Sequence, residues 1–309
     1  MCNTKGMFVT NFKTNAHVLM LLTIILAASS FPVGAAITND LPPVVMMFVR
    51  FLLAAILFAP YVFIKNGLSF PSLKKTIHYT ILSVPLVVFF WAMFESLRYT
   101  SVINTGALYT LVPAITAIFA LLINREITNK FRSFGLFVGT LGALWIVFRG
   151  DYGALISLKL NYGDLIFILG CLFLGLYNPL VKKFYSGEPM EVMTFWVLFL
   201  GSSLLLIASA ENILIIEWRS IGAHVYGGIL YLSLFSTLIT FFLLQLCVVK
   251  IGATKVAAYG FLTPIFVILI SILVGMGSFE LSTLPGILLV ITAMFIIQRE
   301  PKLELSKNA

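Results

Sequence analysis

The sequence has little charge and a large apolar excess. Only 10% of its 309 residues are Asp, Glu, Lys or Arg, whereas soluble domains carry about 25%. Hydrophobic residues make up 60%, and the mean hydropathy is +1.06. A globular core cannot absorb this excess, because the remaining apolar side chains would face water. The composition therefore excludes a soluble enzyme, a nucleic-acid-binding domain and a disordered chain. It predicts an integral membrane protein.

Reactive residues are also few. The three cysteines, Cys2, Cys171 and Cys247, form no C-x-x-C pair, so neither a disulfide framework nor a metal site is predicted. The three histidines fall at the ends of apolar runs, and no run holds two aspartates or an H-E-x-x-H motif. These absences argue against an intramembrane enzyme. We expect no cofactor and no bound metal.

The apolar segments have the length of membrane-spanning helices. A helix crosses a bilayer with about 20 apolar residues, and unbroken apolar runs such as 204–208 argue against the alternating strands of a barrel. The first span could alternatively be a cleaved signal peptide, since Lys5 and Lys13 precede it. The predicted all-α fold has ten spans, at residues 17–37, 43–64, 77–97, 102–123, 133–149, 164–182, 190–210, 225–249, 253–276 and 280–298.

The positive charges predict an orientation. With a cytoplasmic N-terminus, 15 of the 20 Lys and Arg residues fall in cytoplasmic segments and four on the other side. Cytoplasmic loops of membrane proteins carry this excess. The net charge of +8 is thus explained by topology rather than by a nucleic-acid partner. The pattern stays in phase only with an even number of spans, so we expect both termini in the cytoplasm and the protein in the cell (inner) membrane.

The two halves of the sequence resemble each other. Pro32 and Pro179, each followed by a Pro-containing turn, are 147 residues apart, and Pro113 and Pro264 are 151 apart. The repeat unit is therefore about 150 residues, which divides the chain into 1–150 and 151–309. Each unit holds five spans. Because five is odd, the second unit must enter the membrane from the opposite side, as in the inverted repeats of secondary transporters.

Several segments, in this order and spacing, identify a resemblance to the drug/metabolite transporter superfamily, in its ten-helix EamA-like branch. They include SSFPVG at 29–34, RFLLA at 50–54, GDL at 163–165 and LTPIF at 262–266. The resemblance implies two inverted five-helix repeats and export of small metabolites or amino acids. Such proteins often carry a tryptophan just before the first of these segments. Here residues 27–28 are Ala-Ala.

Prolines within the spans are candidate hinges. Pro32, Pro113, Pro179 and Pro264 each remove an amide donor and loosen the preceding turn. In lipid, a freed carbonyl is tolerated where neighbouring side chains or cavity water satisfy it. We therefore expect these four prolines to lie near an internal path and to help the helices move.

Arg50 is the one cation deep inside a span, and Glu95 is a carboxylate at the end of another. An unpaired charge at the bilayer centre costs at least about 2.5–3.5 kcal/mol. Arg50 is therefore expected either to bind an anionic group of the substrate or to pair with Glu95 or Asp164. Glu95 is expected to pair locally with Arg98, three residues on, or to couple a proton. Asp164 is expected to cap its helix.

Polar and aromatic residues deeper in the spans complete the candidate substrate site: Trp91, Tyr109, Asn178, Gln245 and Tyr259, together with Arg50 and Glu95. The alternative for the polar side chains is hydrogen bonding between helices. Most of the 28 phenylalanines are expected to face lipid. Gly135 and Gly139 form a G-x-x-x-G pair that predicts close helix packing, within one protomer or between two.

These features predict a transporter of small organic metabolites, an exporter by the resemblance, working by alternating access. Three alternatives remain. A flippase of the same superfamily would need a lateral opening to lipid, and an uptake carrier would use the same fold in the other direction. A channel would need a filter or a ring of charge. The expected partners are a small-molecule substrate and the bilayer, and the sequence leaves the oligomeric state open.

Overall fold

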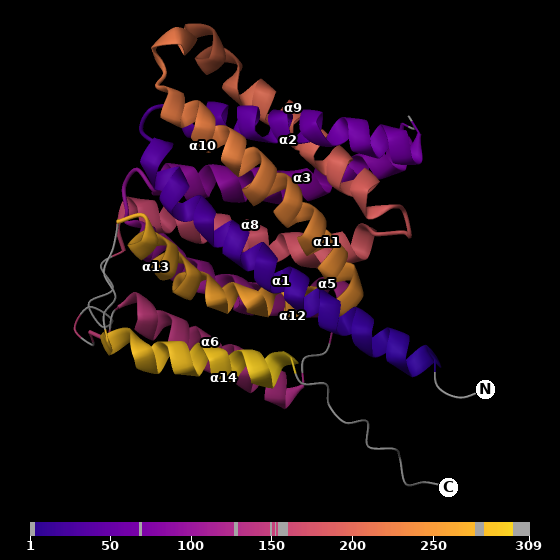
Figure 1. Cartoon of the computed structure of the whole chain (residues 1–309), viewed down its shortest axis with the longest axis vertical. Helices are drawn as coiled ribbons and strands as arrows, with labels where there is room; N and C mark the ends of the chain where they lie inside the picture. The colour runs from indigo at the N-terminus through magenta and orange to yellow at the C-terminus, as the bar shows by residue number, and fades with distance from the viewer. Residues whose placement is uncertain are drawn as a thin grey trace, which may run out of the picture.

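The computed structural model describes residues 4–67, 70–126, 129–148, 150–151, 153, 160–275 and 281–298. In these residues the chain is helical throughout and contains no strand. The long helices lie side by side in a single bundle, most of them running across the view in Figure 1, and α1 crosses them diagonally. The helices are α1 (Thr4–Ile37), α2 (Pro43–Asn66), α3 (Leu73–Ser96), α4 (Val102–Leu108), α5 (Val112–Asn124), α6 (Lys130–Val147), α8 (Tyr162–Phe184), α9 (Met190–Ile215), α10 (Ala223–Ser233), α11 (Thr240–Ile251), α12 (Ala253–Ala258), α13 (Thr263–Leu273) and α14 (Leu284–Gln298).

In the described part of the chain, nine helical segments are long and apolar enough to cross a membrane. Three of them join two α-helices. A 3-10 turn (Tyr109–Leu111) joins α4 to α5, a π-helical stretch (Leu234–Ile239) joins α10 to α11, and a 3-10 turn (Tyr259–Leu262) joins α12 to α13. The predicted span 133–149 corresponds to α6, which is not among the nine. The chain is thus an all-helical multi-pass membrane protein, and the count of ten spans stays a prediction.

Local sequence signals explain where several helices begin and end. Asn161 and Asp164 form a capping box at the start of α8: the Asp164 amide donates to Asn161 Oδ1 (2.8 Å), and the Asn161 amide donates to Asp164 Oδ2 (3.0 Å). This is the capping role predicted for Asp164. At their C-terminal ends, α2 and α11 stop at Gly67 and Gly252, whose φ angles of 74° and 92° favour glycine.

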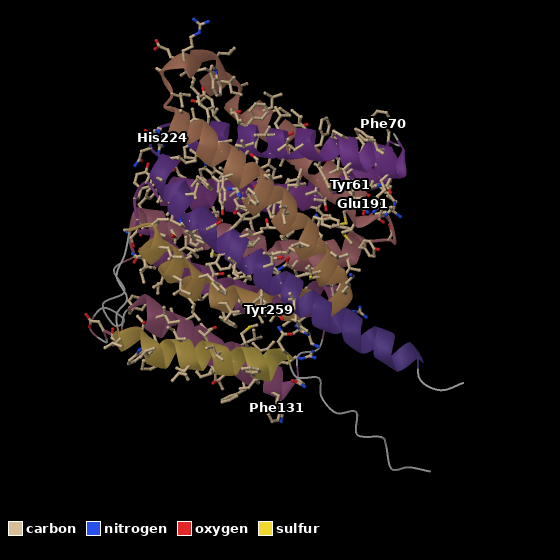
Figure 2. The ribbon with its side chains drawn as sticks, viewed as in Figure 1. Tyr61, Phe70, Phe131, Glu191, His224 and Tyr259 are labelled. Atoms are coloured by element: carbon tan, nitrogen blue, oxygen red, sulfur yellow. The ribbon has the colours of Figure 1, made fainter. Side chains whose placement is uncertain are left out.

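The helices begin and end at two opposite ends of the bundle. We name each end after the two helices whose connecting turn lies there: the α1–α2 end and the α8–α9 end. At the α8–α9 end, Lys75 pairs with Glu188 (3.4 Å) and Lys182 with Glu126. At the α1–α2 end, His224 Nε2 lies 3.0 Å from Asp40. Figure 2 shows Phe70 and Glu191 at the first of these ends and His224 at the second. The contacts mark the two ends of the bundle.

Helix α6 packs along α14 at one edge of the bundle (Figure 1). The contact is close because both helices carry glycine there. A Cβ atom added at Gly142 would lie 2.9 Å from the Gly286 carbonyl oxygen, and one added at Gly286 would lie 2.5 Å from that of Gly142. Gly135 and Gly139 also face side chains of this chain, Ile297 and Phe261. The predicted glycine contact is therefore made within one protomer.

Candidate functional site

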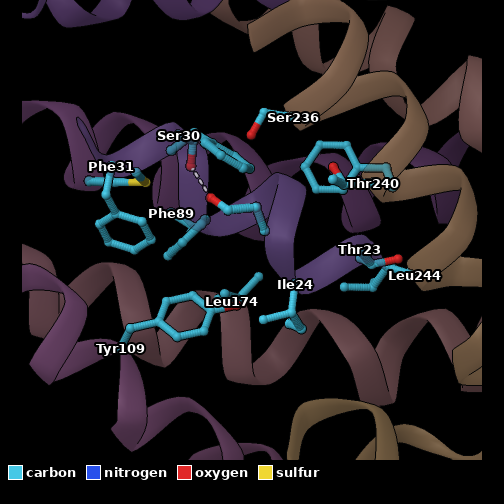
Figure 3. A pocket seen from close by; sticks show the side chains of 14 residues that line it. Thr23, Ile24, Ser30, Phe31, Phe89, Tyr109, Leu174, Ser236, Thr240 and Leu244 are labelled. Atoms are coloured by element: carbon cyan, nitrogen blue, oxygen red, sulfur yellow. Dashed lines mark hydrogen bonds between the residues drawn. The ribbon is translucent and has the colours of Figure 1, made fainter. Parts of the chain in front are cut away.

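A small cavity of about 40 Å³ lies in the middle of the bundle. Helices α1, α3, α8 and α11, with the 3-10 turn before α5 and the π-helical stretch before α11, supply its walls (Figure 3). A cavity of about 10–15 Å³ is large enough for one water molecule, so in this arrangement the cavity has the size of a few water molecules and is too small for an organic solute. Its lining residues are Thr23, Ile24, Ala27, Ser30, Phe31, Phe89, Phe90, Met93, Tyr109, Leu174, Ser236, Thr240, Phe241 and Leu244.

Aromatic rings form much of the cavity wall. The Phe31 ring meets the Tyr109 ring edge-on, with centroids 5.9 Å apart, and the Phe90 and Phe241 centroids are 5.4 Å apart. Phe31, Phe89, Phe90 and Phe241 are all buried. The expectation that phenylalanines face lipid is wrong for these four. The surface they offer suits an apolar or aromatic group, since rings prefer such edge-to-face contacts.

Four hydroxyl groups complete the wall. The Thr23 hydroxyl donates to the Leu19 carbonyl (2.8 Å) and the Ser236 hydroxyl donates to the Leu26 carbonyl (2.9 Å). Ser30 and Thr240 likewise donate to backbone carbonyls of nearby residues. Their oxygens keep lone pairs for a further donor. None of the fourteen lining residues carries a charge at neutral pH. We did not predict these hydroxyls, although Ser233, Ser236, Thr237 and Thr240 recur at the spacing of one helix face.

Two broken helices meet beside the cavity. Each has a 3-10 turn that begins with a tyrosine, Tyr109 or Tyr259, and each resumes as α-helix with a proline at its first positions, Pro113 or Pro264. A Cβ atom added at Gly260 would lie 3.1 Å from the Tyr109 ring. Proline at the start of a helix breaks no backbone hydrogen bond, because the amide at that position has no partner within the helix. These two prolines therefore begin helical segments rather than kink continuous ones.

The other two predicted hinge prolines lie inside continuous helices. Pro32 is in α1, directly after the cavity-lining Phe31. Pro179 is in α8, and its own carbonyl accepts a hydrogen bond from Asn124 Nδ2 (3.1 Å). That bond comes from another helix, α5.

Arg50 lies immediately behind the cavity wall and is completely buried. Its Nε donates to the Thr237 hydroxyl, and its Nη2 donates to the Ser236 carbonyl oxygen (3.0 Å). Both acceptors belong to the π-helical stretch Leu234–Ile239. The guanidinium group therefore links α2 to the irregular part of the α10–α11 segment. The guanidinium carbon also lies 4.3 Å from the centre of the Phe90 ring.

The predicted ion pair of Arg50 with Glu95 or Asp164 is wrong. Glu95 pairs with Arg98 (3.7 Å) and accepts a hydrogen bond from the Tyr99 hydroxyl (3.2 Å). Asp164 is engaged in its helix cap and accepts a hydrogen bond from Thr100 (2.7 Å). Both carboxylates lie at the α1–α2 end, where they stabilise local structure. The positions of these three residues along their spans predicted that they lie towards the same side of the membrane. These positions could not predict the direction in which each side chain points.

The remaining predicted site residues lie away from the cavity lining. Gln245 is fully buried, and its amide donates to the Tyr177 hydroxyl (2.8 Å) and accepts from Thr194 (2.5 Å), so it links α11, α8 and α9. Tyr259 is hydrogen-bonded to His17. Asn178 is buried, and its Oδ1 has no partner. Trp91 is half-buried in α3. Of the seven predicted residues, the structure thus places Tyr109 in the cavity wall and Arg50 directly behind it.

A second, more polar depression of about 430 Å³ lies at the α8–α9 end, where the turn before α9 meets α3. Glu188 is its centre. Its carboxylate accepts hydrogen bonds from the Tyr79 hydroxyl (3.1 Å) and from the backbone amide of Ser186 (3.1 Å), and Lys75 lies 3.4 Å away. Partial burial alone would raise the pKa of Glu188, but the hydrogen bonds from Ser186 and the charge of Lys75 outweigh it, and the pKa is lowered.

Replacing Glu188 by glutamine is expected to lower the melting temperature of the purified protein at pH 7, because charge-assisted hydrogen bonds are lost. Such bonds contribute about 1.5–3 kcal/mol. A carboxylate with a lowered pKa stabilises the folded state above its ordinary pKa of about 4.3, and this contribution is lost as the pH falls through the lowered value. The melting temperatures of wild type and Glu188→Gln should therefore converge at acid pH.

The exposed Glu217 provides the control, because Glu217→Gln should leave the melting temperature unchanged at pH 7. A constant difference between wild type and Glu188→Gln from pH 7 to acid pH would contradict the assigned role.

Comparison with known proteins gives the following similarities. The profile of the EamA-like transporter family matches residues 14–148 and, separately, residues 161–299. A Bacillus subtilis (strain 168) protein described as the uncharacterized transporter YyaM is 26% identical over 84% of this chain and 86% of its own length. An uncharacterized transporter of Archaeoglobus fulgidus is 28% identical over 83% and 87%. One solved crystal structure superposes with a TM-score of 0.73 at 14% identity, covering 92% of this chain and 97% of that one, so the fold is shared.

Proposed function

Since this chain belongs to the EamA-like transporter family, within the drug/metabolite transporter superfamily, and is therefore a membrane transporter, we propose that it carries small organic solutes by alternating access through the central cavity. The observation that carries the proposal is the composition of the cavity wall. Helices α1 and α3 and the turn before α5 come from the first half of the chain, whereas α8 and α11 come from the second. A site shared by two halves can be opened to either side when one half moves against the other.

The two halves are proposed to be inverted repeats, 1–150 and 151–309. Two separate matches to one family profile support this division. So does the matched pair of broken helices, each with a 3-10 turn followed by proline at Pro113 and Pro264. The small volume of the cavity fits a closed state between the two open ones.

The α8–α9 end is proposed to face the cytoplasm. Most described Lys and Arg residues of the loops and helix ends lie there, among them Lys75, Lys130, Lys182 and Lys250, as the positive-inside rule expects. The end of α14 lies at the same face, because Gln298 donates to the Lys255 carbonyl (3.0 Å) at the start of α12. This arrangement supports cytoplasmic termini in a cell-membrane protein. Export is the proposed direction.

The proposal is tested by reconstituting the purified chain in proteoliposomes and measuring counterflow of labelled amino acids, nucleosides and organic cations, with and without a pH gradient. We expect saturable flux of at least one solute above that of empty liposomes. In parallel, a fluorescent phospholipid should not be scrambled between leaflets. Lipid scrambling without solute flux would replace the carrier by a flippase, and ion conductance would replace it by a channel.

A further inference from the structure

Arg50 is a buried cation for which the structure holds no anion. Its side chain is completely inaccessible to solvent. Within the described ranges, no carboxylate oxygen lies within 4.0 Å of its guanidinium nitrogens, and the five ion pairs found there involve other residues. An uncompensated buried charge is costly, several kcal/mol after relaxation. A protein that keeps such a charge commonly uses it.

The guanidinium group also has unused donors. Nε and Nη2 are occupied by Thr237 and Ser236, but Nη1 is buried and has no hydrogen-bond partner among the described residues. A guanidinium group has five N–H donors in a flat fork that matches a carboxylate. The contacts to the π-helical stretch hold one edge of the fork and leave Nη1 available.

The free nitrogen belongs to a group that touches the cavity wall. Phe90, whose ring lies under the guanidinium carbon at 4.3 Å, lines the cavity, and so does Ser236, whose carbonyl accepts from Nη2. A rotation of the Phe90 ring would therefore join the guanidinium group to the cavity. Figure 3 shows Ser236 and Thr240 on the side of the cavity opposite Tyr109 and Leu174.

From these contacts we infer that the cavity, once movement of the two halves opens it, binds an organic acid with one carboxylate and an apolar or aromatic body, with the carboxylate paired to Arg50. This rests on the proposed carrier function and names its substrate class. The aromatic wall receives the body of the solute, and the carboxylate supplies the missing anion. A single carboxylate fits better than a phosphate, because none of the fourteen lining residues is charged, Arg50 behind the wall would be the one cation to meet the solute, and a dianion would leave one negative charge unbalanced.

Matched probes test the inference on the purified full-length chain. Phenylacetate and 3-phenylpropionate are compared with phenylacetamide and 3-phenylpropionamide, which keep the shape and lack the charge. At pH 7.5 both acids are ionised, as carboxyl groups with ordinary pKa values are. We expect at least one acid to raise the melting temperature and to be taken up by counterflow, and its amide to bind at least about tenfold more weakly, as for the loss of a charge-assisted pair.

Arg50 variants then assign the carboxylate to this residue. Arg50→Gln should lose binding and flux of the acid, and Arg50→Lys should keep part of both because the charge remains. Arg98→Gln is the control, since Arg98 is already paired with Glu95 at the α1–α2 end. If Arg50→Gln does not fold, the comparison of acid and amide on the wild-type protein still tests whether the site requires a carboxylate.

The outcomes separate this inference from the function it rests on. Flux of neutral or cationic solutes only, equal affinity for acid and amide, or unchanged acid transport by Arg50→Gln would overturn the organic-acid assignment and leave the carrier function intact. Absence of flux for every solute tested would overturn both.

Discussion

Replacing Thr240 by phenylalanine is expected to abolish transport while leaving the bundle folded. Thr240 lines the cavity from α11. An engineered cavity of about 150 Å³ binds benzene, whereas this cavity has about 40 Å³. The ring therefore overpacks the site, at a cost of about 1–3 kcal/mol, which is less than the stability of about 5–15 kcal/mol typical of folded proteins. The ring would fill the space in which a solute has to be held when the two halves exchange access. Counterflow of whichever solute the wild-type protein carries should fall to the level of empty liposomes.

Thr292 provides a matched control for Thr240. It is an exposed helical threonine on α14 whose hydroxyl also donates to a backbone carbonyl, that of Leu288 (2.8 Å). Thr292→Phe should transport at the wild-type rate. Size-exclusion chromatography shows whether each variant is folded. Full transport by a folded Thr240→Phe protein would mean that the solute takes another path and that the cavity is a packing defect.

Replacing Gly286 by alanine is expected to be among the most destabilising single-methyl additions in this chain. The new Cβ atom would lie 2.5 Å from the Gly142 carbonyl oxygen and 3.0 Å from the Ile146 amide nitrogen. Both are backbone atoms, so the clash can be relieved only if α14 moves away from α6. Overpacking of this kind costs about 1–3 kcal/mol or more. The apparent melting temperature in detergent should fall by several degrees.

Gly227→Ala is the control for this variant. Gly227 lies in α10, and a Cβ atom added there would meet nothing within 4 Å. Alanine favours a helix over glycine by up to about 1 kcal/mol, so this variant should melt at the wild-type temperature or slightly above it. Equal melting temperatures for Gly286→Ala and wild type would show that α6 and α14 do not depend on their close approach.

The glycine contact shows how much of the helix packing the sequence pattern predicted. The G-x-x-x-G pair at Gly135 and Gly139 indicated close packing correctly, because small residues are what let helix backbones approach each other in lipid. The pattern contains no information about the partner. The partner is α14 of the same chain, and the closest approach is at Gly142 and Gly286 rather than at the motif itself.

The candidate site was predicted less well, and the phenylalanines show why. In a soluble helix, one apolar face marks the core. In a membrane helix, lipid and protein interior are both apolar, so Phe90, which lines the cavity, and Phe137, which is exposed, look alike in sequence. The residue types showed which positions within the spans are polar. They could not separate Gln245, whose amide is used by Tyr177 and Thr194, from a residue that faces the cavity.

The sequence by itself determined that this chain crosses a membrane many times and to which family it belongs, and it predicted the face on which most of its charges lie. These properties follow from composition, run length and the order of short motifs, which do not depend on how the helices are rotated. The tertiary structure decided which side chains meet. Arg50 finds Ser236 and Thr237 rather than a carboxylate, because the directions of side chains are set by helix rotation and by packing between residues nearly 190 positions apart, which no local pattern encodes.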